Sequence, residues 1–537
     1  MKKTTVIIIV GMMIVPLLLS ITAKYSNLVL DVPLSGFSED KAKPVFSLEC
    51  FFNGDYQHSY LPWFEQNLKP RGVLTKTYSS LRYNLFDMGN NDVILGAGKD
   101  IFATGYVSGE LCINGGIDYS DPRYQEEMQL CVNKLQQLQD KLREFDKFLF
   151  VYIAASKGNF NYTNIPKRIR DVAPEGRITS TEYFSKLIAD TTIPHIICRD
   201  YKDQLEYPAF YPTGIHWSRT FEQIISSKII EGISQASGKQ YRQLLLGEAN
   251  ESTKPIGRDD DGYSLQNVWN PIRGITFYEY AMSREDKADY DKFRLLIQGD
   301  SFSEGIIGDI RRTFQFQDIH YINRCAYYQA PNSQITPFES WESLDLSSIL
   351  DGVDGVIIEA TEPELQYYFS GFVDYLLSFL ESYVPRPAMH PCVQELDLNR
   401  DEVWDALNSG AVAGLYGKDS NYTWTEPSCL INLQNDTFDK NGLELEFEVP
   451  EALFAINADP ATVEVYINGH RIYRNVFFGQ WKGQVSINPN EFKVISAKDA
   501  IYEMEFFCNK SFVPNQVGIF EDNRDFAIKL YYIGGKR

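Results

Sequence analysis

The stretch LLIQGDSFSEG, residues 295–305, ends a run of apolar residues abruptly at Gly299, Asp300 and Ser301. A short apolar run bounded by turn residues is typical of a buried strand. Open α/β sheets collect their ligands at the carboxyl ends of the strands, so Ser301 lies where a nucleophile would be useful. Gly, Asp and Ser also favour turns for backbone reasons alone. The stretch by itself therefore leaves both a catalytic serine and an ordinary turn open.

Helix and strand patterns alternate on both sides of this stretch. Residues 123–145 carry apolar side chains at alternating spacings of three and four, which predicts a helix, and FLFVYIAA (148–155) follows as a buried strand. Further strands are predicted at 193–198, 293–297 and 353–358, with helices at 184–188, after His216 and at 365–380. Alternating helices and strands need crossover connections, so we expect an α/β fold with a mainly parallel sheet flanked by helices.

The pattern changes after a cluster of prolines at 385, 387 and 391, where we place a domain boundary. Residues 443–449 and 463–467 alternate apolar and polar side chains, as in strands with one wet face. Asn468-Gly469 supplies the residues of a tight hairpin turn. With further strands at 501–507 and 525–533, residues 392–537 are predicted to form an all-β module, most simply a sandwich.

Length and charge limit the classes of function. A chain of 537 residues is too long for one ordinary core, so two domains, or one domain with an added module, are expected. The formal net charge of −21 repels phosphate backbones, which argues against nucleic acid as a partner but does not exclude a sugar polymer. The eight cysteines form no Cys-x-x-Cys pair, so no metal site is predicted.

The N-terminus has the pattern of an export signal. Lys2 and Lys3 precede an uncharged apolar stretch from Thr5 to Ala23, nearly long enough to span a bilayer, and no clear cleavage site follows. We expect residues 1–24 to be an uncleaved membrane anchor rather than a cleaved signal. Residues 25–48 would then be a stalk, and the body would lie outside the cytoplasm in the cell envelope.

A serine nucleophile needs a base, and the most informative of the six histidines is His216. It lies in YPTGIHWS (211–218), between a predicted strand and a helix that Ser218 can cap. A structural histidine at a helix start would fit the same pattern. The candidate catalytic residues are therefore Ser301 and His216.

Together these segments resemble the SGNH-hydrolase-like domain of the alginate O-acetyltransferase family, the AlgX/AlgJ group. In that family an Asp-x-His-Trp motif precedes the serine motif, the reverse of ordinary SGNH esterases, and here His216-Trp217 precedes Gly299-Asp300-Ser301. GAGKDIFATGYV (96–107) resembles the opening strand of the family. Lys157 matches the lysine of its Pro-x-Lys segment, and GVIIEATEPEL (355–365) resembles the strand after the serine motif. The resemblance covers about 49–384 and implies an SGNH-like fold with permuted motif order.

One departure from the family concerns the carboxylate that orients the histidine. The family has Asp two residues before the histidine, but this chain has Gly214 there. We consider Asp300 and Glu359 as replacements, with Asp200 and Asp203 as further candidates at neighbouring strand ends. A backbone carbonyl could also fix the histidine tautomer.

The resemblance implies an extracytoplasmic O-acetyltransferase without a cofactor. It would pass acetyl through an acetyl-serine to hydroxyls of an exported polysaccharide, with a membrane-bound O-acyltransferase as acetyl donor and the amide of Ser301 in the oxyanion hole. The β module could bind carbohydrate. Two alternatives remain open: an acetyl-polysaccharide esterase, in which water is the acceptor, and a non-catalytic glycan-binding or assembly component, which Gly214 keeps in consideration.

Overall fold

The computed structural model describes residues 32–36, 41–68, 70–90, 92–270, 272–285, 290–313, 316–323, 326–330, 332–386, 392–400, 411–434, 442–455, 458–488, 501–514 and 526–536. The predicted anchor, residues 1–24, lies outside these residues, as do residues 25–31 and 37–40 of the stalk. Among the described residues, no helix is both long and apolar enough to cross a membrane.

A seven-stranded sheet forms the centre of the α/β domain, in the order β10-β9-β8-β7-β11-β3-β4. Five neighbouring strands run parallel, and two antiparallel strands extend one edge. The strands are β3 (Phe148–Ala154), β4 (His195–Ile197), β7 (Phe293–Gly299), β8 (Phe316–Asn323), β9 (Ala326–Ala330), β10 (Asn332–Pro337) and β11 (Gly355–Thr361). The predicted mainly parallel sheet is confirmed. The permuted motif order relative to SGNH esterases stays a prediction.

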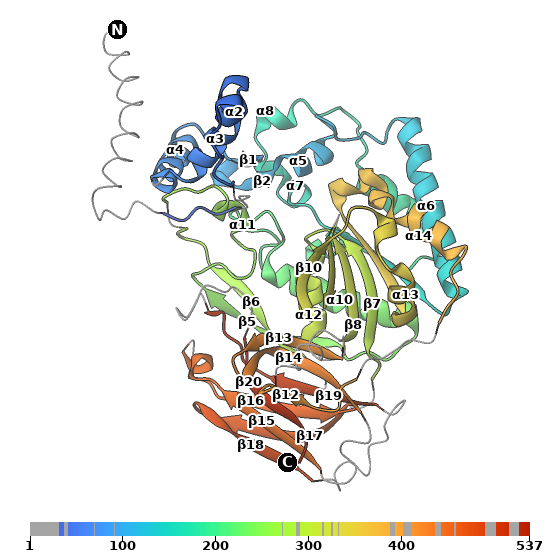
Figure 1. Cartoon of the computed structure of the whole chain (residues 1–537). Coiled ribbons are helices and arrows are strands. Elements are labelled where there is room, and N and C mark those ends of the chain that lie inside the picture. The colour runs from blue at the N-terminus through green and yellow to red at the C-terminus, as the bar shows by residue number, and fades with distance from the viewer. Residues whose placement is uncertain are drawn as a thin grey trace.

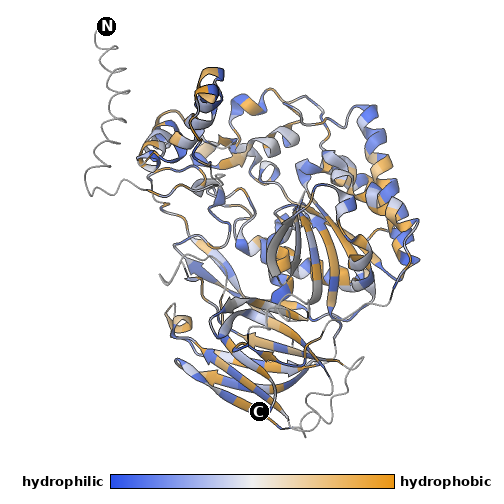
Figure 2. Ribbon diagram, in the orientation of Figure 1, coloured by the Kyte–Doolittle hydropathy of each residue, from blue (hydrophilic) through white to orange (hydrophobic). Residues whose placement is uncertain are grey.

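Helices cover both faces of this sheet (Figure 1). On one face α6 (Pro122–Arg143), α9 (Ser180–Ala189), α13 (Leu346–Gly352) and α14 (Phe372–Leu380) build a core with alternate side chains of the strands. On the other, α10 (Arg219–Ser237) and α12 (Ser303–Arg312) build a second core. The central strands β3, β7 and β11 are buried on both faces, so they appear as largely hydrophobic ribbons, whereas α6 alternates in colour (Figure 2).

Several elements were not predicted from the sequence. The hairpin of β5 (Leu244–Ser252) and β6 (Phe277–Arg284) projects from the domain. At the other end, α2 (Leu48–Asn53), α3 (Asp55–Gln66) and α4 (Arg71–Leu85) precede the small strands β1 (Val93–Leu95) and β2 (Ile101–Ala103). Short helices complete the domain: α5 (Thr104–Leu111), α7 (Lys157–Phe160), α8 (Lys167–Arg170) and α11 (Asp261–Ser264).

The C-terminal strands form one curled sheet rather than the two sheets of a sandwich. The described strands give the path β17-β16-β19-β14-β20-β15-β18, antiparallel throughout, and in addition β12 pairs with β20 and β13 with β14. Their bounds are β12 (Leu396–Asp397), β13 (Val412–Asp419), β14 (Tyr422–Gln434), β15 (Leu443–Val449), β16 (Ala461–Ile467), β17 (His470–Phe477), β18 (Trp481–Ile487), β19 (Ile501–Cys508) and β20 (Lys529–Gly535).

The reason for the single sheet is β14, which is long enough to pair with two neighbours in succession. Thr423 and Trp424 pair with β20, and residues 428–434 pair with β19. Pro427, which has no N–H to donate, lies between the two pairings. The predicted turn at Asn468-Gly469 is confirmed, because both residues have positive φ, 47° and 82°.

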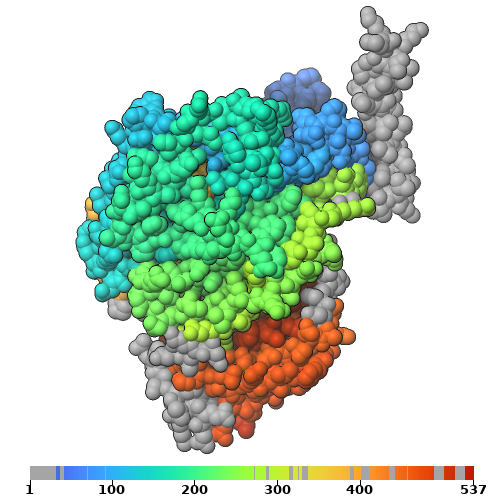
Figure 3. Space-filling model, turned by 180° about the vertical axis from the view of Figure 1, so that it is seen from behind, coloured from blue at the N-terminus to red at the C-terminus, as the bar shows by residue number. Residues whose placement is uncertain are grey.

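The two parts of the chain pack against each other with the helices α2–α4 and the C-terminal sheet at opposite ends of the molecule (Figures 1 and 3). Charged groups cross the interface: Tyr290 donates to Glu505 over 2.9 Å, and Lys292 pairs with the same carboxylate. Arg311 of α12 likewise pairs with Glu426 of β14.

Candidate active site

Ser301 lies in the turn between β7 and α12, at the carboxyl edge of the parallel strands. Gly299 ends the strand in a position that admits no side chain, because a Cβ there would be 2.4 Å from Glu359 Oε2 and 2.5 Å from Ser303 Oγ. The glycine therefore lets the chain turn closely over β11 and brings the serine to the sheet edge. The sequence prediction of a strand ending in this turn is confirmed.

His216 lies directly against this serine. Its Nε2 is 2.7 Å from Ser301 Oγ, a hydrogen-bond distance that suits proton transfer. The histidine belongs to the loop before α10, and Ser218 caps that helix by accepting from the N–H of Phe221 over 3.3 Å, as predicted. Trp217 is buried next to it and packs edge-on against Phe302 of the serine turn. The structure thus brings together the two residues that the sequence singled out.

The carboxylate beside the histidine is Asp261, which the sequence analysis did not consider. Its Oδ2 accepts a hydrogen bond from His216 Nδ1, and Oδ1 accepts from the N–H of Ile215 over 2.7 Å and of Gly262 over 2.7 Å. Burial acts to raise the pKa of Asp261, but the hydrogen bond and charge of His216 and the two backbone donors outweigh it and lower the pKa. Asp261 is therefore an ionised partner that fixes the imidazole ring.

Gly214 explains why the family position holds no aspartate here. A Cβ at Gly214 would be 3.0 Å from the carbonyl oxygen of Asp259 and 3.2 Å from that of Arg258. Thr213 Oγ1 also donates to the Asp259 carbonyl over 2.6 Å. The loop before α11 thus packs onto the histidine loop where a family aspartate would extend, and it supplies Asp261 in its place.

Asp300 and Glu359 do not contact the imidazole, so the suggestion that either of them orients it was wrong. Asp300 Oδ1 accepts from the N–H of Phe302 over 2.9 Å, and Oδ2 accepts from Thr361 Oγ1 over 2.6 Å. Glu359 Oε2 accepts from the N–H of Asp300 over 2.6 Å and from Ser303 Oγ over 3.0 Å. Both carboxyl groups hold the serine turn onto β11.

Burial raises the pKa of Glu359 well above its ordinary range, and the nearby charge of Asp300 acts in the same direction. The other candidates, Asp200 and Asp203, lie in a 3-10 helix after β4, a strand separated from β7 by β11 and β3. Their position in the sheet order explains why they do not reach the histidine.

Lys157, the lysine of the family resemblance, holds the histidine loop by hydrogen bonds to its backbone. Its buried ammonium group pairs with Asp100 over 2.7 Å and donates to the carbonyls of Tyr211 and Gly214, each over 2.7 Å. All three of its protons are used, so the loop that ends in His216 is fixed at two carbonyls.

Arg258 is a cation that contacts both members of the pair. Its Nη1 donates to the carbonyl of Ser301 over 2.7 Å and lies 3.3 Å from His216 Nε2, while Nη2 pairs with Glu304 of α12. The side chain is about one third exposed. Arg258 therefore joins the loop that carries Asp261 to the turn that carries Ser301.

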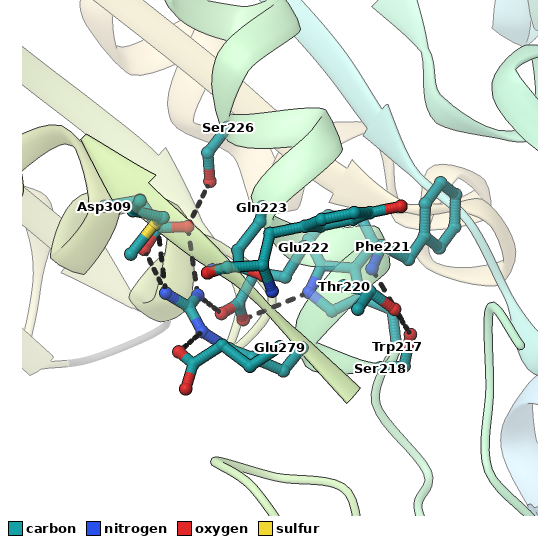
Figure 4. A network of polar contacts seen from close by, with 12 residues as sticks. Trp217, Ser218, Thr220, Phe221, Glu222, Gln223, Ser226, Glu279 and Asp309 are labelled. Carbon is teal, nitrogen blue, oxygen red and sulfur yellow. Dashed lines mark hydrogen bonds and ion pairs between the residues drawn. The ribbon is translucent and has the colours of Figure 1, made fainter. Parts of the chain in front are cut away.

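A buried ion network fixes the two helices that follow the histidine and the serine (Figure 4). Arg219, the first residue of α10, pairs with Asp309 of α12 over 2.6 Å, with Glu279 of β6 over 3.0 Å and with Glu222. Ser226 donates to the same Asp309 over 2.8 Å. Because α10 begins three residues after His216 and α12 two residues after Ser301, this network sets the separation of the pair.

Asp261 could not be identified from the sequence because only a turn signal marks it. It lies in GRDDDGYS (257–264), a polar stretch without periodicity, 45 residues after His216. The acidic run before a glycine is the one local signal, and it favours a turn. Within the described residues, no group of three or more His, Cys, Asp or Glu side chains is arranged to hold a metal ion.

Solved structures similar to this chain include proteins of the group that the motifs resemble. The O-acetyltransferase domain of Pseudomonas putida AlgJ matches 54% of this chain and 98% of its own, at 13% identity and a TM-score of 0.33. Pseudomonas aeruginosa AlgX matches 86% and 98%, at 10% identity and a TM-score of 0.34. Bacillus cereus PatB1 matches 45% and 91%, at 13% identity and a TM-score of 0.28.

No family model and no curated protein sequence matches the chain. The identities and TM-scores of the solved structures are too low to indicate a shared activity. Support for the chemistry comes instead from the geometry of Ser301, His216 and Asp261.

Proposed function

We propose that this protein is a serine O-acetyltransferase that acts outside the cytoplasm on a polysaccharide. The observation that carries the proposal is the line of hydrogen bonds from Ser301 Oγ through His216 to Asp261, at the carboxyl edge of a parallel sheet. A serine, a histidine and a buried carboxylate in this order form the arrangement that activates a hydroxyl for attack on an acyl group. The sequence motifs add acetyl as the acyl group and a glycan as the acceptor.

In the first step His216 Nε2 removes the proton of Ser301 Oγ while the oxygen attacks the acetyl carbonyl of the donor. The tetrahedral intermediate collapses, its leaving group takes the proton from His216, and the acetyl group remains on Ser301. Asp261 stabilises the transient imidazolium and holds its ring. The N–H of Ser301 is the donor that we assign to the oxyanion, together with a second donor.

In the second step His216 takes the proton of a sugar hydroxyl, whose oxygen attacks the acetyl-serine. Ser301 leaves with the proton from His216, and the sugar carries the acetyl ester. Water in the place of the sugar would give free acetate, which is the esterase alternative. Donor delivery by a membrane-bound O-acyltransferase and an anchor at Thr5–Ala23 belong to the same proposal.

The polysaccharide would bind in a cleft of about 560 Å³ between the β5–β6 hairpin and the C-terminal sheet. Cationic side chains gather in its wall: Arg284, Arg312, Arg471, Arg474 and Lys510. Glu279 lines the same cleft and holds Arg219, so the wall is connected to the helix that follows His216. Basic residues in a chain of net charge −21 suit a polymer that carries acidic groups.

The test uses the full chain with a chromogenic acetyl ester and an acidic polysaccharide, and follows both released acetate and acetyl bound to the polymer. We expect acetylated polymer from the wild type and none from Ser301→Ala or His216→Ala. Free acetate without polymer acetylation would favour the esterase. A wild type without activity on either substrate would favour the binding component, in spite of the carboxylate that Asp261 supplies.

A further inference from the structure

Residues 45–88 concentrate the exposed apolar surface of the molecule. They contain twelve of the twenty large hydrophobic side chains that are exposed in the described part of the chain, among them Val45 (87%), Phe52 (82%) and Leu48 (68%). Apolar patches of this kind on a soluble body indicate a surface that binds a protein or a membrane. Neither α2 nor α3 contains a buried residue, whereas α4 buries Tyr83 against the domain.

The aromatic rings of this region contact one another instead of entering a core. Consecutive contacts join Phe51 to Phe46, Phe46 to Tyr56, Tyr56 to Tyr60, and Tyr60 to Trp63 and Phe64, with centroids 5.1–6.0 Å apart. Positions 56, 60, 63 and 64 share one face of α3. We call the six residues in these contacts the aromatic ladder: Phe46, Phe51, Tyr56, Tyr60, Trp63 and Phe64. Tyr and Trp are the residues enriched where proteins meet the headgroups of a bilayer.

The region lacks the negative charge that the rest of the chain carries. Residues 45–88 contain four Lys or Arg and four Asp or Glu, a formal charge of zero, so the remaining residues carry all of the −21. Lys43 lies over the ring of Trp63, 5.3 Å from its centroid. Helices with aromatic side chains on one face lie in the plane of a membrane interface.

We propose that α2 and α3 lie on the surface of a phospholipid bilayer, with the aromatic ladder in the headgroup region. A bilayer is the occupant that the chain itself indicates, because the apolar stretch Thr5–Ala23, the expected membrane anchor, precedes the ladder by about twenty residues. Such a contact would direct the C-terminal sheet, at the opposite end of the molecule, away from the lipid (Figure 3).

The test places a fluorescent probe on the full chain at Phe52→Cys and, as matched controls, at Phe478→Cys and Val172→Cys. Phe52 and Phe478 are both 82% exposed and Val172 is 64% exposed, so the three substitutions leave the cores intact. The background carries Cys50→Ser and Cys392→Ser, because both native thiols are partly exposed. The chain is reconstituted in vesicles of phosphatidylglycerol and phosphatidylethanolamine with brominated acyl chains.

We expect brominated lipid to quench the probe at position 52 several-fold more than the probes at 478 and 172. Equal quenching at all three positions would overturn the proposal. So would a probe at 52 that is shielded from aqueous iodide but insensitive to brominated lipid, since this would indicate a protein partner. Ester hydrolysis by the same labelled chains is measured in parallel, so failure of lipid contact is distinguishable from failure of the proposed chemistry.

Discussion

At the scale of single residues, Asp261 supplies the carboxylate that a catalytic role for Ser301 and His216 requires. Without a partner at Nδ1 the imidazole could rotate or adopt the wrong tautomer. The carboxylate of Asp261 accepts hydrogen bonds from the histidine and from two backbone N–H groups, so the position of Asp261 is fixed as well.

Asp261→Asn should therefore lower kcat for a chromogenic acetyl ester by about 10³- to 10⁴-fold with little change in KM, because the amide would hold the histidine in the wrong tautomer. The control is Asp260→Asn, one residue earlier, whose carboxylate accepts from Ser264 Oγ of α11 over 3.0 Å. Equal rates in the two variants would show that Asp261 has no such role.

Restoring the family residue by Gly214→Asp should reduce activity rather than improve it. The new Cβ would lie 3.0 Å from the carbonyl oxygen of Asp259 and push away the loop that carries Asp261. We expect a loss of about 1–3 kcal/mol in the free energy of unfolding and a larger relative loss of ester hydrolysis. Urea unfolding and initial rates on the same preparation measure both; an unchanged or faster enzyme would contradict the account of Gly214.

The loop before α11 also contains a carboxyl group that titrates near neutrality. Burial, helped by the charge of Glu222 and opposed by the N–H groups of Arg219 and Ile256, raises the pKa of Asp259 from 3.8 to about 7. Between about pH 4 and pH 7 the carboxyl group of Asp259 therefore keeps its proton in the folded protein and loses it in the unfolded chain. The stability that this proton gives is complete below about pH 4 and is lost as the pH rises to about 7.

Asp259→Asn should therefore flatten the pH dependence of stability. Between pH 5 and pH 8 the wild type should lose more free energy of unfolding than the variant, by at most about 3 kcal/mol. Urea unfolding of both proteins at the two pH values measures the difference. A wild type that loses no more than the variant would refute the assignment.

At the scale of elements, the first turn of α10 and the body of α12 are joined by buried charges. Arg219 and Asp309 are 8% and 1% exposed, and each has further partners on α10 or β6. Removing one member of such a pair leaves the other charge buried without compensation, which costs about 3–5 kcal/mol.

Arg219→Ala should destabilise the protein by this amount and lengthen the contact between the histidine and the serine, lowering kcat at permissive temperature. Lys228→Ala on the same helix is the matched control, since its exposed pair with Glu231 should contribute at most about 1 kcal/mol. Thermal unfolding and ester hydrolysis are compared. Equal stability losses in the two variants would contradict a structural role for the network.

At the scale of the whole molecule, the cleft between the hairpin and the C-terminal sheet is the site that we propose for the polymer, and it is lined by residues other than the proposed catalytic ones. Arg471 and Arg474 in its wall are about half exposed and both lie against Glu464. Their ion pairs lie within the C-terminal sheet, so changing them leaves the contacts of the Ser301 turn in place.

The double variant Arg471→Ser, Arg474→Ser should bind an acidic polysaccharide several-fold more weakly, with the rate on a small acetyl ester unchanged. Arg168→Ser, an exposed arginine of α8, is the control. Binding by sedimentation at two salt concentrations and ester hydrolysis give the two readouts. Unaltered binding would remove the cleft from the proposal.

The sequence determined the elements whose signals are local. The buried strands 148–154, 293–299 and 355–361 and the helix α6 follow from apolar runs and periodicity, and Asn468-Gly469 predicted its turn. The position of Ser301 at a strand end followed in the same way, because a turn after a buried strand places its residues at the sheet edge. His216 followed from the motif it shares with the family.

Only the tertiary structure decided the carboxylate, the sheet of the C-terminal module and the apolar surface of α2 and α3. Asp261 reaches His216 because the chain folds back over Gly214, a close backbone approach that leaves no periodic trace in the sequence. The strands of the module alternate alike in a sandwich or a curled sheet, and the two differ only in how β14 pairs along its length. Residues such as Phe52 and Leu48 are of the type that fills cores, and their exposure depends on what other elements cover them.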